Sequence, residues 1–346
     1  MSDRVLSDPV ASDPVGIDIA VLGSGSWGTA LAIQLCRNGH RVRLWGNESD
    51  QIAELRAHGE NRRFLPGVPF PPGLVPQQSL EETLSGAAAC LAVVPSHAFA
   101  EVITALGTRL PRGIGLAWAT KGLEPQSGAL LHTLAERGLP GESLAIVSGP
   151  SFAREVAIGL PTAVTVASED QAFARRTAGL LHGGRFRAYT SSDLVGVEIC
   201  GAAKNVLAIA TGIADGLGFG ANSRAALITR GLSELIRLGA ALGGRPETFM
   251  GLAGVGDLVL TCTDDQSRNR RLGLALARGA SVAQARAAIG QEVEGVITAA
   301  AVRTLAHRLG VEMPISEQVY QVLYEGVPPL AATAALLERE PKAEFG

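Results

Sequence analysis

The chain has 346 residues, of which 47% are hydrophobic and 18% charged, and 30 Lys and Arg against 33 Asp and Glu leave a net charge of -3. This length favours about two domains of roughly 100–200 residues, with a core that folds without staples. The near-neutral charge argues against a nucleic-acid or membrane-surface binder, because neither polyanion meets a basic field. Glycine is enriched, at 42 residues, so the positions of the glycines are informative.

Residues 1–15 carry acids and prolines without an apolar signal-peptide core, and we expect them to form a disordered extension. Residues 339–346 are expected to form a polar tail. The four cysteines form no C-x-x-C pair and are expected to be reduced. No apolar run approaches the ~18 residues of a membrane span. We therefore expect a cytoplasmic protein without membrane contact.

Short apolar runs recur through the first half of the chain and alternate with amphipathic stretches, a pattern typical of parallel strands buried on both faces. The predicted strands are Ile17–Leu22, Arg41–Trp45, Ala89–Val94, Ile114–Ala119, Leu144–Ser148 and Thr162–Ala167. Beyond residue 192 the predicted helices include Leu194–Ala214, Ser223–Leu242, Ser281–Ala287 and Thr298–Leu309. The sequence thus predicts an α/β fold: a doubly wound sheet domain over residues 16–192 and an all-helical domain over residues 193–338.

A G-x-G-x-x-G motif spans Gly23 to Gly28, directly after the first predicted strand and before a helical run. In that order, the glycines allow a tight turn, close approach to a pyrophosphate and close helix packing, so the motif predicts dinucleotide binding. Glu48 lies twenty residues beyond Gly28 and suits the ribose 2′-hydroxyl of NAD, whereas Asn47 is neutral. The choice between NAD and NADP is left open.

Two further segments follow predicted strands, Lys121-Gly122 and Ser148–Ala153. Ligands gather at the carboxyl ends of strands in doubly wound sheets, so both are candidates for the cofactor or the substrate. The alternative is a solvated loop lysine and an ordinary turn. The second segment also resembles a nucleophile elbow, but it lacks the last glycine, and no histidine is suggestively placed.

Lys204 and Asn205 lie within an otherwise apolar predicted helix. A lysine there either extends to solvent or is partly desolvated, so that its pKa falls toward neutrality and it can exchange protons. The small residues around Lys204 favour the second interpretation.

The remaining polar clusters lie in the second half. Asp257 lies on a glycine-rich turn, and Ser267–Arg271 groups a hydroxyl, an amide and three guanidinium groups, a composition that suits a phosphate. The alternative is a solvated basic helix face. Glu292 and Glu294 precede a helix, where they either cap its N-terminus or contact cofactor hydroxyls.

Together these segments resemble the bacterial NAD(P)-dependent glycerol-3-phosphate dehydrogenase family over about residues 17–330. The matching motifs are Gly23–Gly28, Asn61–Pro66, Lys121-Gly122, Ser148–Val156, Gly201–Asn205, Asn222–Gly231, Gly251–Leu258, Ser267–Gly273 and Glu292–Gly295. The resemblance implies hydride transfer between NAD(P)H and dihydroxyacetone phosphate, giving sn-glycerol 3-phosphate for glycerophospholipid synthesis. It also implies a Rossmann-type domain joined to an all-α domain resembling that of 6-phosphogluconate dehydrogenase, often in a homodimer.

The resemblance also implies residue roles, with Lys204 as proton donor and acceptor, assisted by Lys121 and Asp257. The implied substrate contacts are Lys121, Gly149, Ser151, Lys204, Asp257, Ser267, Arg268 and Asn269. The implied cofactor contacts are Gly23, Ser24, Gly25, Ser26, Trp27, Gly28, Asn47, Lys121, Ala153, Arg268, Glu292 and Glu294. No metal is expected. Two alternatives stay open: a dehydrogenase for a non-phosphorylated hydroxyacid or ketoacid, and a non-catalytic NAD(P)-responsive module.

Overall fold

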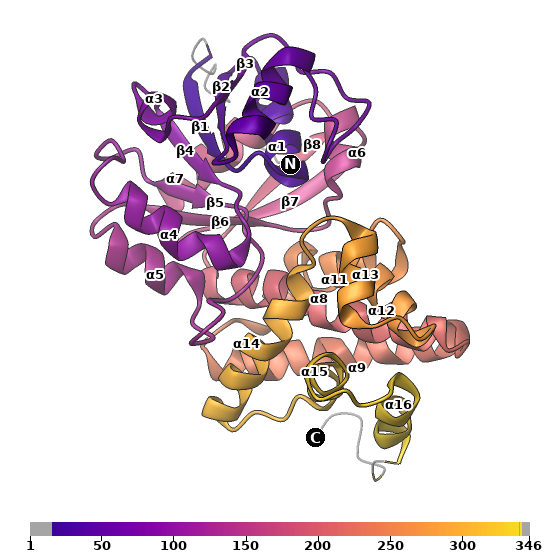
Figure 1. The fold of residues 1–346 in the computed structure, drawn as a ribbon. Helices are drawn as coiled ribbons and strands as arrows, with labels where there is room; N and C mark the ends of the chain where they lie inside the picture. Colours follow the sequence, from indigo (N-terminus) through magenta and orange to yellow (C-terminus); the bar gives the residue numbers. More distant parts are fainter. Residues whose placement is uncertain (1–15, 339, 341–346) are drawn as a thin grey trace, which may run out of the picture.

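The computed structural model describes residues 16–338 and 340, which form a mostly parallel sheet flanked by helices and followed by a bundle of helices (Figure 1). The predicted extension of residues 1–15 and most of the predicted tail lie outside this part. The strands are β1 (Asp18–Leu22), β2 (Arg41–Trp45), β3 (Leu74–Gln77), β4 (Ala89–Ala92), β5 (Leu116–Trp118), β6 (Leu144–Ser148), β7 (Thr162–Ala167) and β8 (Phe186–Ser191). The predicted fold class is confirmed.

The strand order across the sheet is β3-β2-β1-β4-β5-β6-β7-β8. Strands β1 to β6 pair in parallel, β7 is antiparallel to β6, and β8 is parallel to β7. The chain reverses its direction of winding between β1 and β4, the switch point beside which such sheets bind ligands. The glycine motif that follows β1 therefore lies at the expected position for a ligand.

Each predicted strand is present, although β4 and β5 are shorter than predicted. The prediction missed β3 and β8, the two edge strands, because their sequences are not continuously apolar. Pro76 interrupts β3, and β8 exposes Arg187 and Tyr189. Strand β7 departs from the predicted parallel arrangement because β6 connects to it through the six-residue helix α6 rather than a full crossover helix.

Helices cover both faces of the sheet and enclose two separate apolar cores. Helices α1 (Ser26–Arg37), α2 (Ser49–His58), α6 (Ala153–Ile158) and α7 (Gln171–Leu181) supply one core. Helices α3 (Leu80–Leu84), α4 (Ser96–Leu106) and α5 (Leu131–Gly138) supply the other, together with the start of α8. Because both faces are buried, the polar loops at the carboxyl ends of the strands are the part of the sheet left for a ligand.

The second part of the chain is helical throughout the described residues (Figure 1). Its elements are α8 (Leu194–Gly216), α9 (Gly220–Ala241), α10 (Pro246–Phe249), a π-helical turn η1 (Leu252–Gly256), α11 (Asp257–Thr263), α12 (Arg268–Ala277), α13 (Val282–Ile289), α14 (Glu294–Leu309), α15 (Pro314–Tyr324) and α16 (Pro329–Leu337). Helix α8 lies at the centre, against α9, α11, α12 and α14. It is the single described helix long and apolar enough to cross a membrane, but 94% of its apolar window is buried inside the protein, as befits a core helix.

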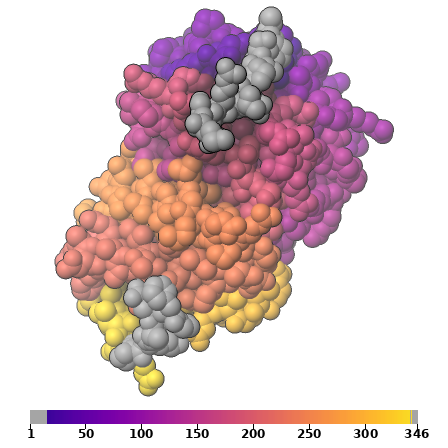
Figure 2. Space-filling view, turned by 180° about the vertical axis from the view of Figure 1, so that it is seen from behind, coloured from indigo at the N-terminus to yellow at the C-terminus, as the bar shows by residue number. Residues whose placement is uncertain are grey.

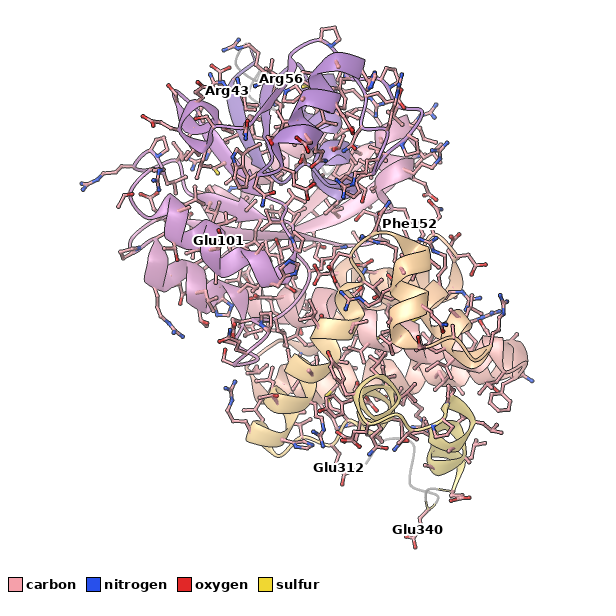
Figure 3. All side chains as sticks on the ribbon, viewed as in Figure 1. Arg43, Arg56, Glu101, Phe152, Glu312 and Glu340 are labelled. Atoms are coloured by element: carbon pink, nitrogen blue, oxygen red, sulfur yellow. The ribbon has the colours of Figure 1, made fainter. Side chains whose placement is uncertain are left out.

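The sheet part and the helical part form two lobes, seen from behind in Figure 2 as an indigo-to-magenta region above an orange-to-yellow one. Phe152, labelled in Figure 3, lies at the junction of the lobes, where β6 ends and α6 begins. Asp193 follows β8 and caps α8: its carboxylate accepts from the Gly196 N–H, the Arg245 N–H and the Thr248 hydroxyl. Strand β6 contacts α8 and strand β7 contacts η1, so the sheet lies against the N-terminal half of the helical part.

Candidate active site

The glycine motif forms the turn between β1 and α1 at the switch point of the sheet. Gly28 is packed so closely that a Cβ there would lie 1.8 Å from the Gly23 carbonyl oxygen. A Cβ on Gly25, in contrast, would meet no atom within 4 Å. Gly25 is the N-cap of α1 and provides no side-chain cap, so the positive end of the helix is available to an anion.

The residues around this turn fit a dinucleotide. The indole N–H of Trp27 is buried without a hydrogen-bond partner among the described residues, as expected of a donor that awaits a ligand. Ser26 begins α1 beside it. The Ser24 hydroxyl, however, is buried and donates to Gln51 Oε1 over 2.9 Å, so this side chain is already engaged within the protein.

The loop after β2 carries the residues considered for cofactor choice. Asn47 is exposed there. The carboxylate of Glu48 lies 2.8 Å from the Arg63 guanidinium, and both side chains are about half exposed. An acid for a ribose hydroxyl and a base for a ribose phosphate therefore lie side by side at the end of β2.

Lys204, Asp257 and Lys121 meet at one point between the lobes. Lys204 Nζ lies 2.5 Å from Asp257 Oδ1, and Lys121 Nζ lies 2.8 Å from Asp257 Oδ2. Helix α8 supplies Lys204, the start of α11 supplies Asp257 and the loop after β5 supplies Lys121. The Asp257 side chain is 1% exposed and that of Lys204 7%. One buried carboxylate therefore bridges two ammonium groups.

The electrostatics of the cluster favour proton exchange at Lys204. Burial, together with the nearby charge of Lys121, lowers the pKa of Lys204 to about 8, against the opposing effect of Asp257. Burial alone would raise the pKa of Asp257, but the charges of Lys121 and Lys204 lower it overall. Asp257 therefore stays ionised, while Lys204 changes protonation near neutral pH.

Gly149 and Ser151 follow β6 and contact the same cluster. The Gly149 carbonyl oxygen accepts from Lys121 Nζ over 3.0 Å and from the Ser151 hydroxyl over 2.9 Å. Ser151 therefore binds the neighbouring backbone rather than a histidine, which goes against the nucleophile-elbow interpretation. Ala153 begins α6 just beyond and is partly buried against the sheet core.

The cluster of Ser267, Arg268 and Asn269 forms the N-terminus of α12. The Ser267 oxygen caps the helix by accepting from the Arg270 N–H, which leaves its own proton to donate. The Arg268 guanidinium makes no hydrogen bond or ion pair within residues 16–338 and 340, although burial lowers its pKa. A largely buried guanidinium at a helix N-terminus is suited to a phosphate.

Asn269 connects this helix to the rest of the site. Its Nδ2 donates to Asn205 Oδ1 over 2.9 Å, and its Oδ1 accepts from the Gly295 N–H over 2.9 Å. Asn205 directly follows Lys204, so α12 is tied to the helical turn that carries the buried lysine. In this structure the amide of Asn269 is thus engaged by protein groups at both ends.

Glu294 crosses between the lobes to the switch point. Its carboxylate accepts from the Ser96 N–H over 3.1 Å and the Ser96 hydroxyl over 2.6 Å, at the N-terminus of α4. Burial raises the pKa of Glu294, which these hydrogen bonds partly offset. Glu292 instead lies 3.6 Å from the Arg286 guanidinium. Glu294 therefore faces the loop after β4, whereas Glu292 contacts its own domain.

Sequence reasoning missed Thr261, whose hydroxyl lies at the centre of the site. Its Oγ1 accepts from Lys204 Nζ over 2.9 Å and donates to the Asp257 carbonyl oxygen over 2.6 Å. The available signal was its spacing, since Thr261 lies four residues after Asp257 and hence on the same helix face. Ser96 was missed as well, because the contact that gives it a role depends on a residue 198 positions away.

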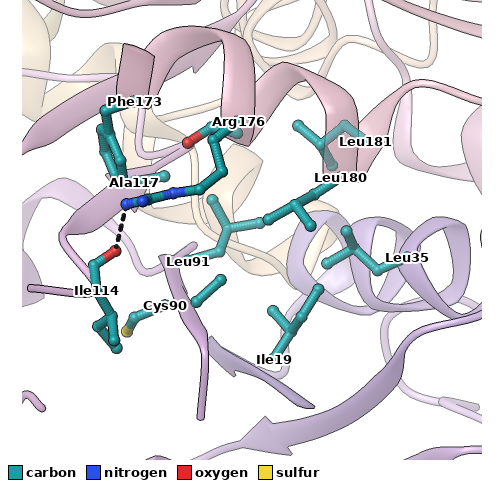
Figure 4. A pocket seen from close by; sticks show the side chains of 12 residues that line it. Ile19, Leu35, Cys90, Leu91, Ile114, Ala117, Phe173, Arg176, Leu180 and Leu181 are labelled. Carbon is teal, nitrogen blue, oxygen red and sulfur yellow. Dashed lines mark hydrogen bonds between the residues drawn. The ribbon is translucent and has the colours of Figure 1, made fainter. Parts of the chain in front are cut away.

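A small apolar pocket of about 20 Å³ lies elsewhere, under the sheet (Figure 4). Ile19, Leu91, Phe173 and other apolar side chains line it, and Arg176 closes one side by donating to the Ile114 carbonyl oxygen. The pocket is small and apolar, and it belongs to the core rather than to the site.

A doubly wound sheet with a dinucleotide-binding turn is joined here to a helical domain, and buried lysines lie between the two. This combination defines a two-domain nicotinamide-dependent dehydrogenase. The family description NAD-dependent glycerol-3-phosphate dehydrogenase N-terminus matches residues 18–174, and the corresponding C-terminus description matches residues 193–334. Two curated relatives bear the name Glycerol-3-phosphate dehydrogenase [NAD(P)+]. The one from Thioalkalivibrio sulfidiphilus is 57% identical over 94% of this chain and 98% of its own, and the one from Pseudoalteromonas translucida is 54% identical over the same shares.

A solved structure agrees with the relatives. The glycerol-3-phosphate dehydrogenase of Coxiella burnetii superposes with a TM-score of 0.92 at 51% identity, covering 94% of this chain and all of that one. At 14% identity and a TM-score of 0.62, D-mandelate dehydrogenase shares the fold alone. The chain belongs to the NAD-dependent glycerol-3-phosphate dehydrogenase family, and this replaces both alternatives left open by the sequence.

Proposed function

We propose that the protein reduces dihydroxyacetone phosphate to sn-glycerol 3-phosphate with NAD(P)H, and catalyses the reverse reaction. The observation that carries the proposal is the buried bridge of Lys204 and Lys121 by Asp257, with Arg268 in the helical domain unpaired among the described residues. The names of the relatives support the substrate and the cofactor.

In this proposal Trp27, Gly25 and the N-terminus of α1 hold the dinucleotide, and Glu294 contacts it from the helical domain. Bound there, the nicotinamide cofactor supplies the hydride that reduces the substrate carbonyl. The Arg268 guanidinium and the Ser267 hydroxyl bind the substrate phosphate. Asn269 is a further proposed substrate contact on α12. Gly149 and Ser151 are two more, and they lie beside Lys121 on the side of the site nearest β6.

Lys204 is the proposed acid. As an ammonium group it has three protons, of which Asp257 and Thr261 accept one each. The third proton remains for the substrate oxygen, so the two acceptors fix the direction in which Lys204 donates. In the reverse reaction, neutral Lys204 accepts the proton of the alcohol. Such positioned proton transfer typically contributes ~10²–10⁴-fold to the rate.

Lys121 is the proposed second cation. Its Nζ is held by Asp257 and by the Gly149 carbonyl oxygen, so it is fixed beside the reacting centre. A fixed positive charge in a water-poor site stabilises the negative charge that develops on the substrate oxygen. Asp257 positions both lysines and prevents their mutual repulsion from opening the site.

We further propose a division into a cofactor domain over residues 16–192 and a substrate domain over residues 193–338. Two separate family descriptions and the separate apolar core of the helical part support this division. We place the enzyme in the cytoplasm, where its product would supply glycerophospholipid synthesis.

The proposed reaction is tested by following the absorbance of NADH or NADPH in a mixture of the purified protein and dihydroxyacetone phosphate. Loss of absorbance only when the phosphorylated ketone is present supports it, and no loss with either cofactor contradicts it.

A further inference from the structure

Asn61 opens a motif that the proposed chemistry does not use, yet it lies against the glycine turn. Its side chain is 0% exposed. The Nδ2 of Asn61 donates to the Ser24 carbonyl oxygen over 2.9 Å and to Thr29 Oγ1 over 2.8 Å. Its Oδ1 accepts from the Phe64 N–H over 3.1 Å, which fixes the orientation of the amide. The motif therefore presents an amide N–H group to the turn.

A second buried amide reaches the same carbonyl. Gln51 Nε2, from α2, donates to the Ser24 carbonyl oxygen over 2.8 Å, while Gln51 Oε1 accepts from the Ser24 hydroxyl. The carbonyl oxygen has two lone pairs, and two protein donors occupy them. Turning this carbonyl outward would take a hydrogen-bond acceptor from both buried amides, which is unfavourable.

The direction of the Ser24 carbonyl sets the direction of the next N–H. In a trans peptide the C=O and the following N–H point in opposite directions. With the Ser24 carbonyl held inward, the Gly25 N–H points outward, away from Asn61 and Gln51. Within residues 16–338 and 340 this N–H has no hydrogen-bond partner, and the space over Gly25 is open.

We propose that Asn61 and Gln51 are positioning residues that hold the Ser24–Gly25 peptide so that the Gly25 N–H donates to the cofactor pyrophosphate. This assignment rests on the proposed function, since it requires NAD(P)H at the turn. The N–H is in place before the ligand arrives, and a hydrogen bond to an anionic oxygen is among the stronger kinds. Asn61 and Gln51 touch neither substrate nor reacting atoms.

The test is direct binding of NADH, NADPH and ADP-ribose to the full-length protein, measured by calorimetry. Asn61→Ala and Gln51→Met each remove one donor to the Ser24 carbonyl. We expect each variant to weaken all three ligands by the same factor, about tenfold or more, because the pyrophosphate is common to them. At saturating cofactor, kcat and the KM for dihydroxyacetone phosphate stay unchanged.

Gln34→Met is the matched control. Gln34 is 5% exposed, like Gln51, and its amide donates to the Leu181 and Gly183 carbonyl oxygens at the other end of α1. We expect this variant to lose thermal stability and keep its affinity for the three ligands. The control distinguishes the effect of losing any buried amide on or near α1 from the effect of losing the orientation of the Ser24–Gly25 peptide.

Three outcomes would overturn the assignment: unchanged affinity in folded Asn61→Ala and Gln51→Met, an equal loss in Gln34→Met, or a loss confined to one ligand. If Asn61→Ala does not fold, the ligand affinities of Gln51→Met alone test the assignment. Wild-type protein that binds none of the three ligands would overturn the proposed function together with this assignment. Wild-type binding with unaffected variants would overturn the assignment and leave the proposed function intact.

Discussion

Lys204 and Asp257 lie 53 residues apart in sequence, yet Lys204 Nζ and Asp257 Oδ1 are 2.5 Å apart. Helix α8 presents the lysine, and the π-helical turn that ends at Gly256 delivers the carboxylate as the first residue of α11. Because the same carboxylate holds Lys121 from the sheet domain, the geometry of the site depends on Asp257 more than on either lysine.

Removal of the Thr261 hydroxyl tests how Lys204 is aimed. Thr261→Val keeps the shape of the side chain but removes the acceptor for Lys204 Nζ, so we expect kcat to fall about tenfold with little change in cofactor affinity. Thr261→Ser keeps the hydroxyl and should recover most of the rate. Steady-state kinetics of the pair provide the check, and equal kcat in Thr261→Val and wild type would show that Thr261 does not aim the lysine.

Arg268 tests the phosphate site. Arg268→Ala removes the guanidinium proposed to bind the phosphate, and we expect the KM for dihydroxyacetone phosphate to rise about tenfold to a hundredfold. Arg271→Ala is the matched control, because Arg271 is exposed on the same helix. An unchanged KM in Arg268→Ala, or an equal rise in both variants, would exclude Arg268 as the phosphate ligand.

The sequence predicted the doubly wound sheet and singled out Lys121, Lys204 and Asp257, which the structure brings together, because each signal was local. The G-x-G-x-x-G turn directly follows an apolar strand, and Lys204 interrupts an apolar helix. What could not be predicted depends on contacts between distant segments: the bridge by Asp257, the engagement of Glu294 by Ser96, and the burial of the Ser24 hydroxyl against Gln51. Edge strands escaped prediction for a related reason, since their residues face both core and solvent.

The lowered pKa of Lys204 predicts the pH dependence of the reaction. Reduction requires protonated Lys204, so kcat/KM for dihydroxyacetone phosphate should fall as pH rises above about 8, well below the ordinary lysine value of 10.5. Oxidation of glycerol 3-phosphate requires the neutral amine and should rise through the same range. Rate profiles in both directions measure this, and a reduction rate that stays level up to the ordinary lysine value would refute the assignment of Lys204 as the acid.

His132 and Glu198 predict a pH-dependent stability away from the site. His132 Nδ1 lies 2.6 Å from the carboxylate of Glu198, which is buried on α8. Burial would lower the pKa of His132, but the hydrogen bond and charge of Glu198 raise it overall. This stabilisation is therefore fully present below the unfolded value of about 6.5 and is lost as pH rises through the raised value.

Thermal unfolding across that pH range tests the pair. Wild type should lose melting temperature as pH rises through the His132 transition, and His132→Gln should lack this component, because glutamine does not titrate. The melting temperatures of the two proteins are compared at each pH, so that the contributions of other titrating groups cancel. Parallel curves for both proteins would show that the pair contributes no pH-dependent stability.

Lys204 is the residue that we propose transfers the proton in the reduction of dihydroxyacetone phosphate. Lys204→Met tests it most directly, because methionine fills the volume of the lysine stem without a titrating group. The measurement is kcat from nicotinamide absorbance together with the Kd for NADH and NADPH in the same preparation. We predict a fall in kcat of about 10²–10⁴-fold or more with an unchanged Kd. Near-normal turnover by Lys204→Met would show that Lys204 is not the proton donor.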